Sequence, residues 1–377
     1  MKIATPLPRK EFRPPPLTRL TLGTVLALAT AGAAFAQPHY TVKELPTPAG
    51  YELSVPYQIN DQGFVAGSST LPNDPSGSVA TIWKNGSVTV LGRLPKGTYS
   101  IANAINSKGV VAGEGDDGDG RPLAWANTSG KLVNFFSNNG GNTRPMAINE
   151  AGEIGGYYIK GFSSNWRGAI WRVDAKDPRK STIIDLPYLP GGDPTSASAI
   201  PFAFNKSNEA AGWAVNNVIG QHAAYWMSNA AHTIVDLGVF ESDWSSVANG
   251  LNDLGQVVGS SHPPFGSRPV LWNNDAAHTA YELPLLPGHN YGSAGMINSA
   301  GTIVGSSAAS EPGTWNVGPS QIVIWSEGVV YDLQSLLDPS AAAWSINEVT
   351  SINNLGQLAA LATRDGVSRA IVLTPFP

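Results

Sequence analysis

The sequence has no cysteine among its 377 residues. This absence excludes disulfides, thiol catalysis, cysteine metal ligands and a lipid-modified N-terminal cysteine. Charged residues are also few, because Asp, Glu, Lys and Arg make up only 14% of the chain. The fold must therefore be held together by an apolar core.

Long apolar runs and basic clusters are missing as well. After residue 36, no apolar stretch is long enough to span a membrane. The formal net charge is −5, and it becomes −9 if the basic N-terminal segment is removed. Binding to a phosphate backbone requires clustered Lys and Arg. We therefore predict no nucleic-acid partner and no membrane span, and we expect a monomer.

The first 36 residues have the order of a secretory signal peptide. Residues 1–19 contain five basic residues and one acid, residues 20–33 are apolar, and Ala34-Phe35-Ala36 precedes a cleavage site. Basic, apolar and small-residue regions in this order direct export. We expect cleavage after Ala36 and a periplasmic or extracellular protein that consists of residues 37–377.

The chain is rich in residues that punctuate strands, with 41 glycines and 29 prolines. It also repeats a motif in which Asn is followed by Gly three and seven residues later. The repeat asparagines are Asn60, Asn106, Asn149, Asn205, Asn252, Asn298 and Asn353. Their spacings of 46, 43, 56, 47, 46 and 55 residues are typical of a repeat architecture.

The motif fits a tight hairpin turn. Asn is favoured at the first position of a type I turn, and Gly three residues later suits the left-handed residue of a bulge. In the fourth copy Asn208 replaces this Gly, and asparagine tolerates left-handed angles. We interpret the repeated Asn and Gly residues as structural rather than catalytic.

A tryptophan strand follows each hairpin, and then comes a fourth strand that often ends in an acid and Leu. The tryptophans are Trp83, Trp125, Trp171, Trp226, Trp272 and Trp325, with Leu373 in the seventh copy. Four short strands in about 45 residues predict a β-propeller blade, with the tryptophans in the core between blades.

The two ends of the chain complement one another. The seventh unit stops after three strands, whereas residues 40–45 form a fourth-strand pattern with no unit before it. Pairing of these segments would bury two sheet edges. We predict an all-β fold, a seven-bladed β-propeller of four-stranded blades, closed by the N-terminal strand and forming a single domain over residues 37–377.

Residues 220–226, Gly-Gln-His-Ala-Ala-Tyr-Trp, resemble the His-Ala-Phe signature of the HAF-type extracellular repeat family. The Asn-x-x-Gly-x-x-x-Gly segment before them also matches that family's repeat. The likeness covers nearly all of the mature chain, although only one copy keeps the His. The resemblance implies a secreted bacterial repeat protein with no established activity and no catalytic residues to carry over.

An acidic stretch provides a candidate calcium site, since alternating Asp and Gly can surround Ca²⁺ with oxygen atoms. The candidate ligands are Glu114, Asp116, Asp117 and Asp119. The spacing does not match an EF-hand, and the alternative is a solvated hairpin loop. No other cofactor is predicted.

The segment Gly259-Ser260-Ser261-His262 suggests a serine nucleophile beside a base. Gly-Ser-Ser also occurs at 67–69 and 305–307 without His, so a repeated strand end is the better explanation. We predict no catalytic residue.

Aromatic and basic residues outside the repeat positions fall in two kinds of long connection, which emerge on the same face of a propeller. Such residues dominate binding hot spots. The alternative is that they fill loops and shield the rim. The candidate binding residues are Tyr99, Arg144, Trp166, Arg167, Trp244, Arg268, His289, Tyr291, Trp315 and Trp344.

These features favour a secreted, non-enzymatic repeat scaffold that binds a glycan or an envelope or extracellular protein through the long-loop face. One alternative is an extracellular polysaccharide hydrolase or lyase with its site at the channel mouth. Such an enzyme would need ionisable groups that converge on one substrate atom. A purely structural envelope component is the third hypothesis.

Overall fold

Short apolar segments separated by glycine-containing turns fold into strands along the whole described chain. The computed structural model describes residues 38–376 except 119–121, 129, 137–141, 160–165, 175, 178–179, 192–197, 217–219 and 315. The chain divides into a unit of residues 1–33 and a unit of residues 34–377, and the propeller belongs to the second. The predicted leader lies outside the described residues. Within the described part, no helix has the length and apolarity to cross a membrane.

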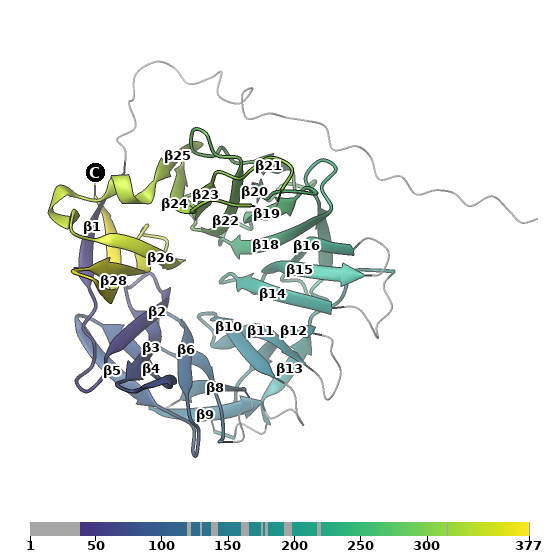
Figure 1. Ribbon diagram of the computed structural model, residues 1–377. Coiled ribbons are helices and arrows are strands. Elements are labelled where there is room, and N and C mark those ends of the chain that lie inside the picture. The colour runs from purple at the N-terminus through teal and green to yellow at the C-terminus, as the bar shows by residue number, and fades with distance from the viewer. Residues whose placement is uncertain are drawn as a thin grey trace, which may run out of the picture. The chain divides into compact units, whose positions relative to one another are not determined.

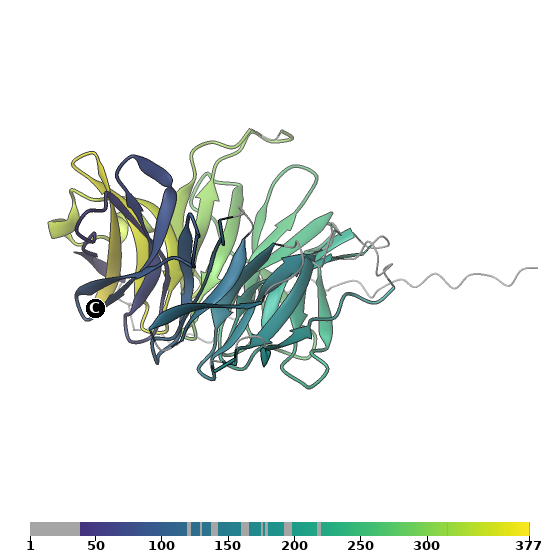
Figure 2. The same cartoon turned by 90° about the horizontal axis from the view of Figure 1, so that it is seen from below.

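The strands form seven antiparallel sheets of four strands, which are arranged as blades around a common centre (Figures 1 and 2). Blades 1 to 3 comprise β2 (Leu53–Ile59), β3 (Val65–Leu71), β4 (Asp74–Lys84) and β5 (Ser87–Gly92); β6 (Ser100–Ile105), β7 (Val111–Gly115), β8 (Leu123–Thr128) and β9 (Lys131–Phe136); β10 (Thr143–Ile148), β11 (Glu153–Ile159), β12 (Trp166–Arg172) and β13 (Thr182–Asp185).

The remaining blades continue the same order along the chain. Blades 4 to 6 comprise β14 (Ser198–Phe204), β15 (Ala210–Asn216), β16 (Gly220–Trp226) and β17 (Ile234–Gly238); β18 (Ser245–Leu251), β19 (Val257–His262), β20 (Arg268–Trp272) and β21 (Ala280–Glu282); β22 (Tyr291–Ile297), β23 (Ile303–Ala308), β24 (Gln321–Ser326) and β25 (Val329–Asp332). Two 3-10 turns, η4 (Leu333–Leu336) and η5 (Pro339–Ala341), lead to blade 7.

Blade 7 closes the ring. It combines β26 (Ser345–Ile352), β27 (Leu358–Arg364) and β28 (Val367–Phe376) with the N-terminal strand β1 (His39–Glu44). β1 pairs antiparallel with β28, from His39 opposite Phe376 to Glu44 opposite Ile371. The predicted seven-bladed propeller and its closure by the N-terminal strand are both confirmed.

The core lies between neighbouring blades. One cluster joins Ala66 and Ile82 of blade 1 to Ala102 and Trp125 of blade 2, and further clusters follow around the ring. The six repeat tryptophans are at most 2% exposed, which confirms their predicted place in the core. Burial of large apolar side chains, at about 25 cal/mol per Å², is therefore the main force that holds the blades together.

Two hydrogen-bonded clamps reinforce the blade interfaces. Where a fourth strand is followed by Leu-Pro, the next blade's tryptophan donates its ring N–H to the proline carbonyl, as Trp83 does to Pro46 at 2.8 Å. Trp226 and Trp325 make the same bond to Pro187 and Pro284. A second type of clamp uses serine and glycine.

The serine clamp occurs where the fourth strand ends in Leu-Gly. Ser100 accepts the Ala80 N–H at 2.8 Å and donates to the Gly92 carbonyl at 2.6 Å. Ser246 bonds to Ala223 and Gly238 in the same way. Ser100 lies in blade 2 and Ser246 in blade 5. The tryptophans of these blades, Trp125 and Trp272, have ring N–H groups that lack a hydrogen-bond partner among the described residues. Each of these five interfaces therefore uses one clamp or the other.

Candidate functional site

The repeat asparagines form a ring around one end of the channel, which we call the turn mouth. Within its own turn, Asn60 Oδ1 accepts the N–H groups of Gln62 and Phe64 at 3.0 and 2.9 Å. Gly63 has φ +73° and Asn208 has φ +62°, so the predicted turn chemistry is confirmed. The side-chain amide does more, because its N–H reaches the next blade.

Six of the seven asparagines donate Nδ2 to the backbone carbonyl of the next repeat asparagine. The distances are 2.8 to 3.1 Å, and the bond from Asn353 to Asn60 closes the circle. The exception is Asn149, which donates to the side chain of Asn208, the residue that replaces the repeat glycine. The sequence predicted the turns but gave no signal for these bonds between blades.

A polar lock crosses the turn mouth, and we call it the channel latch: Asp61, Lys206, Asp253 and Asn354. Lys206 Nζ lies 2.9 Å from Asp61 Oδ2 and 3.0 Å from Asp253 Oδ2. Asn354 Nδ2 donates to the same two oxygens at 3.1 and 3.0 Å. These residues come from blades 1, 4, 5 and 7, so their side chains meet across the channel.

Hydrogen bonds within the latch favour the charged forms of Asp61 and Lys206. Burial raises the pKa of the Asp61 carboxyl, but hydrogen bonds from Lys206 and Asn354 outweigh burial and lower it below the ordinary value. Burial lowers the pKa of Lys206, but hydrogen bonds from Asp61 and Asp253 outweigh burial and raise it. Both groups therefore stay charged at neutral pH, and opposite charges keep the latch closed.

A second ring lies deeper in the channel. Every first strand has a β-bulge three residues before its repeat asparagine, and a bulge re-aims the side chain it carries. We call these positions the bulge ring: Tyr57, Asn103, Met146, Phe202, Asn249, Gly295 and Thr350. The members include aromatic, aliphatic, amide and hydroxyl side chains and one glycine, whereas the asparagine ring is uniform.

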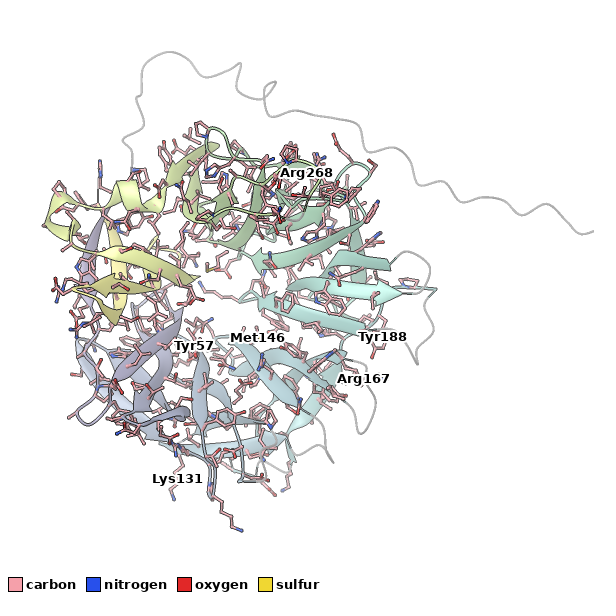
Figure 3. All side chains as sticks on the ribbon, viewed as in Figure 1. Tyr57, Lys131, Met146, Arg167, Tyr188 and Arg268 are labelled. Atoms are coloured by element: carbon pink, nitrogen blue, oxygen red, sulfur yellow. The ribbon has the colours of Figure 1, made fainter. Side chains whose placement is uncertain are left out.

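The two rings line two neighbouring cavities. The cavity at the turn mouth has a volume of about 470 Å³ and is lined by the asparagine ring and the latch. The cavity on the other side has a volume of about 630 Å³ and is lined by the bulge ring except Gly295. Gln58, Phe204 and Ile352 border both cavities, so the two cavities share part of their walls. Figure 3 shows Tyr57 and Met146 beside the centre of the ring.

A charged pair stands at the opposite end, which we call the loop mouth. Arg144 Nε donates to Glu114 Oε2 at 2.9 Å, and Glu114 is only 6% exposed. Burial raises the pKa of the Glu114 carboxyl, and the neighbouring Arg144 only partly opposes this. Burial, Glu114 and Asp116 together raise the pKa of Tyr99 to about 12.

The structure brings together three of the predicted binding residues. Tyr99 and Arg144 lie beside Glu114 at the loop mouth. Arg144 also interacts with Tyr157, whose ring packs edge-on against Trp166 at 5.2 Å. Tyr99, Arg144 and Trp166 therefore form one patch on blades 2 and 3.

Three other predicted binding residues contact different partners. Arg167 lies over the ring of Tyr188, 5.4 Å from its centroid (Figure 3). Arg268 pairs with Glu241 at 3.3 Å, and His289 Nδ1 lies 2.8 Å from Ser307 Oγ in a loop anchor.

The four remaining candidates have different outcomes. Trp244 is 69% exposed, and Tyr291 begins β22 opposite Ala308. Trp315 lies outside the described residues. The prediction for Trp344 is wrong, because Trp344 is 7% exposed in a core cluster and the guanidinium of Arg364 covers its ring at 4.4 Å.

Protein groups bond to the acidic residues Glu114 and Asp116. Asp116 is fully buried and accepts the N–H groups of Thr98 and Tyr99 at 2.5 and 3.0 Å. Glu114 pairs with Arg144, Asp117 is exposed, and Asp119 lies outside the described residues. Among the residues with assigned positions, no three His, Asp or Glu side chains converge as a metal site requires.

The serines near His262 have structural partners. Ser261 Oγ accepts the Phe240 N–H at 2.9 Å, and Ser307, at the same repeat position, accepts the Leu286 N–H at 3.2 Å. Ser260 lies 3.3 Å from His262 Nε2 but is only 5% exposed. The repeated Gly-Ser-Ser therefore anchors loops in these blades.

The comparisons agree with the propeller fold. No family model and no curated protein matches the sequence. The chain is similar to the β-propeller domain of the Trilobed protease from Pyrococcus furiosus, with a TM-score of 0.52 and 11% identity, over 87% of this chain and 94% of that one. That domain is described as having an open velcro topology, whereas β1 closes the ring here.

The chain is also similar to a prolyl endopeptidase structure, with a TM-score of 0.52 and 11% identity, over 87% of this chain. It spans about half of that protein, 47% of its length. Identities this low establish the fold alone.

The comparisons nevertheless correct the functional prediction. The sequence favoured a non-enzymatic scaffold for a glycan or protein, with a polysaccharide hydrolase or lyase and an envelope component as alternatives. The two similar structures described above are instead the propeller domain of a protease and a prolyl endopeptidase. The three earlier hypotheses are replaced by the proposal below. The resemblance to HAF-type repeats remains a prediction.

Proposed function

We propose that this chain is the propeller of a peptidase-type system, and that its central channel takes up an unfolded segment of polypeptide. The observation that carries the proposal is the channel itself, with the latch at one mouth and the bulge ring inside. In such a system the propeller takes up the polypeptide, and a catalytic domain distinct from the propeller cleaves the peptide bond. The likeness to peptidase propellers supports the choice of polypeptide as the ligand.

The size of the channel favours an unfolded ligand. The two cavities measure about 470 and 630 Å³. Cavities of roughly 300–1,000 Å³ hold a small-molecule-sized ligand. A few residues of extended chain fit this volume, whereas a folded domain does not.

The bulge ring offers contacts for varied side chains. Tyr57, Met146 and Phe202 present apolar surface, and methionine adapts to differently shaped partners. Asn103 uses its Nδ2 to bond the Pro145 carbonyl at 2.9 Å, which turns its side-chain oxygen to other donors. A wall of this kind can accept many sequences without a close fit to any one.

The latch supports control of passage. Its ion pairs are partly exposed, with 49% of the Lys206 side chain accessible. Ion pairs of this kind contribute only about 0–1 kcal/mol each. The channel latch can therefore open at a small cost in free energy, while the hydrogen bonds of the asparagine ring stay intact.

The absence of cysteine allows a direct test. Met146→Cys places a single thiol on the channel wall, and Val329→Cys places one at a position that is 49% exposed on blade 6. An unfolded polypeptide should slow alkylation at position 146 several-fold and leave position 329 unchanged. The same polypeptide in its folded form should protect neither. Equal alkylation of Met146→Cys with and without the unfolded chain would overturn the proposal.

A further inference from the structure

Equivalent positions in the seven blades can be compared to decide whether the fold requires the charged residues at the loop mouth. Each blade pairs one residue of its first strand with one of its second strand at equivalent positions. The pairs are Val55–Ser68, Ile101–Glu114, Arg144–Tyr157, Ile200–Trp213, Val247–Ser260, Ser293–Ser306 and Glu348–Leu361. Four of the pairs carry no charge. The fold therefore does not require the charges at Glu114, Arg144 and Glu348.

Of these three charged residues, Glu114 costs the folded protein the most free energy, because it is buried. Its residue exposure is 6%, and an unpaired carboxylate is expensive to remove from water. Arg144 offsets part of this cost, but an apolar pair of similar size is commonly as stable as a buried ion pair. Departures from a local rule without structural benefit concentrate at functional sites.

The surroundings of Glu114 face the channel. Glu114, Arg144 and Tyr57 all line the 630 Å³ cavity, and Tyr99 lies close enough for Glu114 to affect its pKa. Burial is the main cause that raises the pKa of both tyrosines, so both rings are neutral at neutral pH. The face of a neutral phenol attracts a cation.

The charge at this mouth is unbalanced. Glu114, Asp116 and Glu348 are acidic, whereas Arg144 is the basic residue that acts on the two tyrosines. Asp116 is occupied by the N–H groups of Thr98 and Tyr99. Arg144 donates a hydrogen bond to Oε2 of Glu114. No described residue donates to Oε1 of Glu114.

We infer that the Glu114 carboxylate binds an ammonium group of the polypeptide in the channel, with Tyr57 and Tyr99 against the same group. The inference rests on the proposed function and names the chemistry that the loop mouth selects. The ammonium group comes from a free N-terminus or from a lysine side chain. Both sources present the same N–H donors to Oε1.

The test compares three peptides of one length and one otherwise uncharged sequence, all amidated at the C-terminus. One has a free N-terminus, one is acetylated with an internal lysine, and one is acetylated with glutamine in place of that lysine. Binding to the full propeller is measured by fluorescence anisotropy. Wild type should bind one or both ammonium peptides at least about tenfold more tightly than the neutral peptide, and Glu114→Gln should remove this preference. Which peptide gains identifies the source.

Two further variants keep the test decisive if Glu114→Gln folds poorly. Glu114→Ser/Arg144→Val installs residues that blades 1 and 5 have at these positions, so this variant should fold and lose the preference. Glu348→Gln removes a carboxylate on blade 7, two blades from Glu114, and should keep most of the preference. Equal binding of all three peptides to wild type overturns the inference alone, whereas no binding of any peptide overturns the proposed function. A fourth peptide, acetylated and neutral but with a free C-terminal carboxylate, extends the test: tighter binding of this peptide than of the neutral amide to wild type, lost in Arg144→Val, also overturns the inference.

Discussion

At the scale of single residues, the repeat asparagine performs two tasks with one side chain. In Asn252, the oxygen accepts the N–H groups of Leu254 and Gln256 at 3.1 and 2.9 Å and fixes the turn. The Nδ2 donates to the Asn298 carbonyl at 3.0 Å and joins blade 5 to blade 6. Asparagine is therefore required for a reason beyond its preference for turns, since Asp and Ser also form such turns.

Substitutions at Asn252 separate the two tasks. Asn252→Asp keeps the turn acceptor but loses the donor to Asn298, and should destabilise the protein by about 1–3 kcal/mol, as expected for a buried carbonyl left unsatisfied. Asn252→Ala loses both tasks and should cost more. Urea unfolding measures both changes. Equal stability of Asn252→Asp and wild type would contradict a structural role for the ring.

The serine clamps give a second prediction at this scale. Ser100→Ala and Ser246→Ala each leave a buried N–H and a buried carbonyl without their partner. Each should lower the free energy of unfolding by about 1–3 kcal/mol. The exposed Ser87→Ala is the matched control and should change stability by less than about 0.5 kcal/mol. A loss no greater than that of the control would show that the clamp contributes nothing.

At the scale of strands, the sequence predicted the architecture because each blade repeats local chemistry. The Asn and Gly turns and the Trp strands all have signals within a few residues, and seven copies remove ambiguity. The site has no such signal. The latch joins Asp61 to Lys206, which are 145 residues apart, and the bulges that aim Tyr57 and Met146 into the channel depend on pairing that only the folded sheet defines.

Sequence also misplaced Trp344, because a tryptophan outside the repeat positions looks like an exposed loop residue. The structure buries it where η4 and η5 lead into blade 7, against Arg364. Comparison between blades could have found Glu114 and Arg144. They occupy positions that are uncharged in four of the blades, and this comparison requires the strand register.

The closing strand gives the prediction that belongs to this scale. A chain beginning at Thr47 lacks β1 and loses the buried Tyr40 and Leu45. At roughly 1.5–3 kcal/mol for each large side chain, it should lose about 3–6 kcal/mol of stability. A synthetic peptide of residues 38–46 should restore much of this by pairing with β28. Thermal unfolding measures both effects, and an unchanged melting temperature in the truncated chain would contradict closure by β1.

At the scale of the whole molecule, the latch couples blades that are distant in the ring. Lys206→Met should raise the pKa of Asp61, because the hydrogen bond from Lys206 is lost while burial remains. Since the folded-state pKa of Asp61 is depressed, its stabilising contribution is present at neutral pH and is lost as pH falls through that pKa. The variant should therefore lose less than about 1 kcal/mol at pH 7, and still less in acid.

Carboxyl NMR titration and urea unfolding at several pH values test this prediction. Lys131→Met, which removes an exposed lysine from the outer strand β9 (Figure 3), is the control and should leave Asp61 unchanged. An Asp61 pKa that is the same in Lys206→Met and wild type would show that the latch does not form.

The central claim is that an unfolded polypeptide enters the channel, and the methionines of the unmodified protein test it most directly. Met146 and Met296 line the channel, whereas Met227 is 40% exposed on blade 4. Oxidation of methionine to its sulfoxide follows accessibility, and mass spectrometry measures it at each site. An unfolded polypeptide should slow oxidation of Met146 and Met296 and leave oxidation of Met227 unchanged. Protection of Met227 alone, or of none of the three, would contradict it.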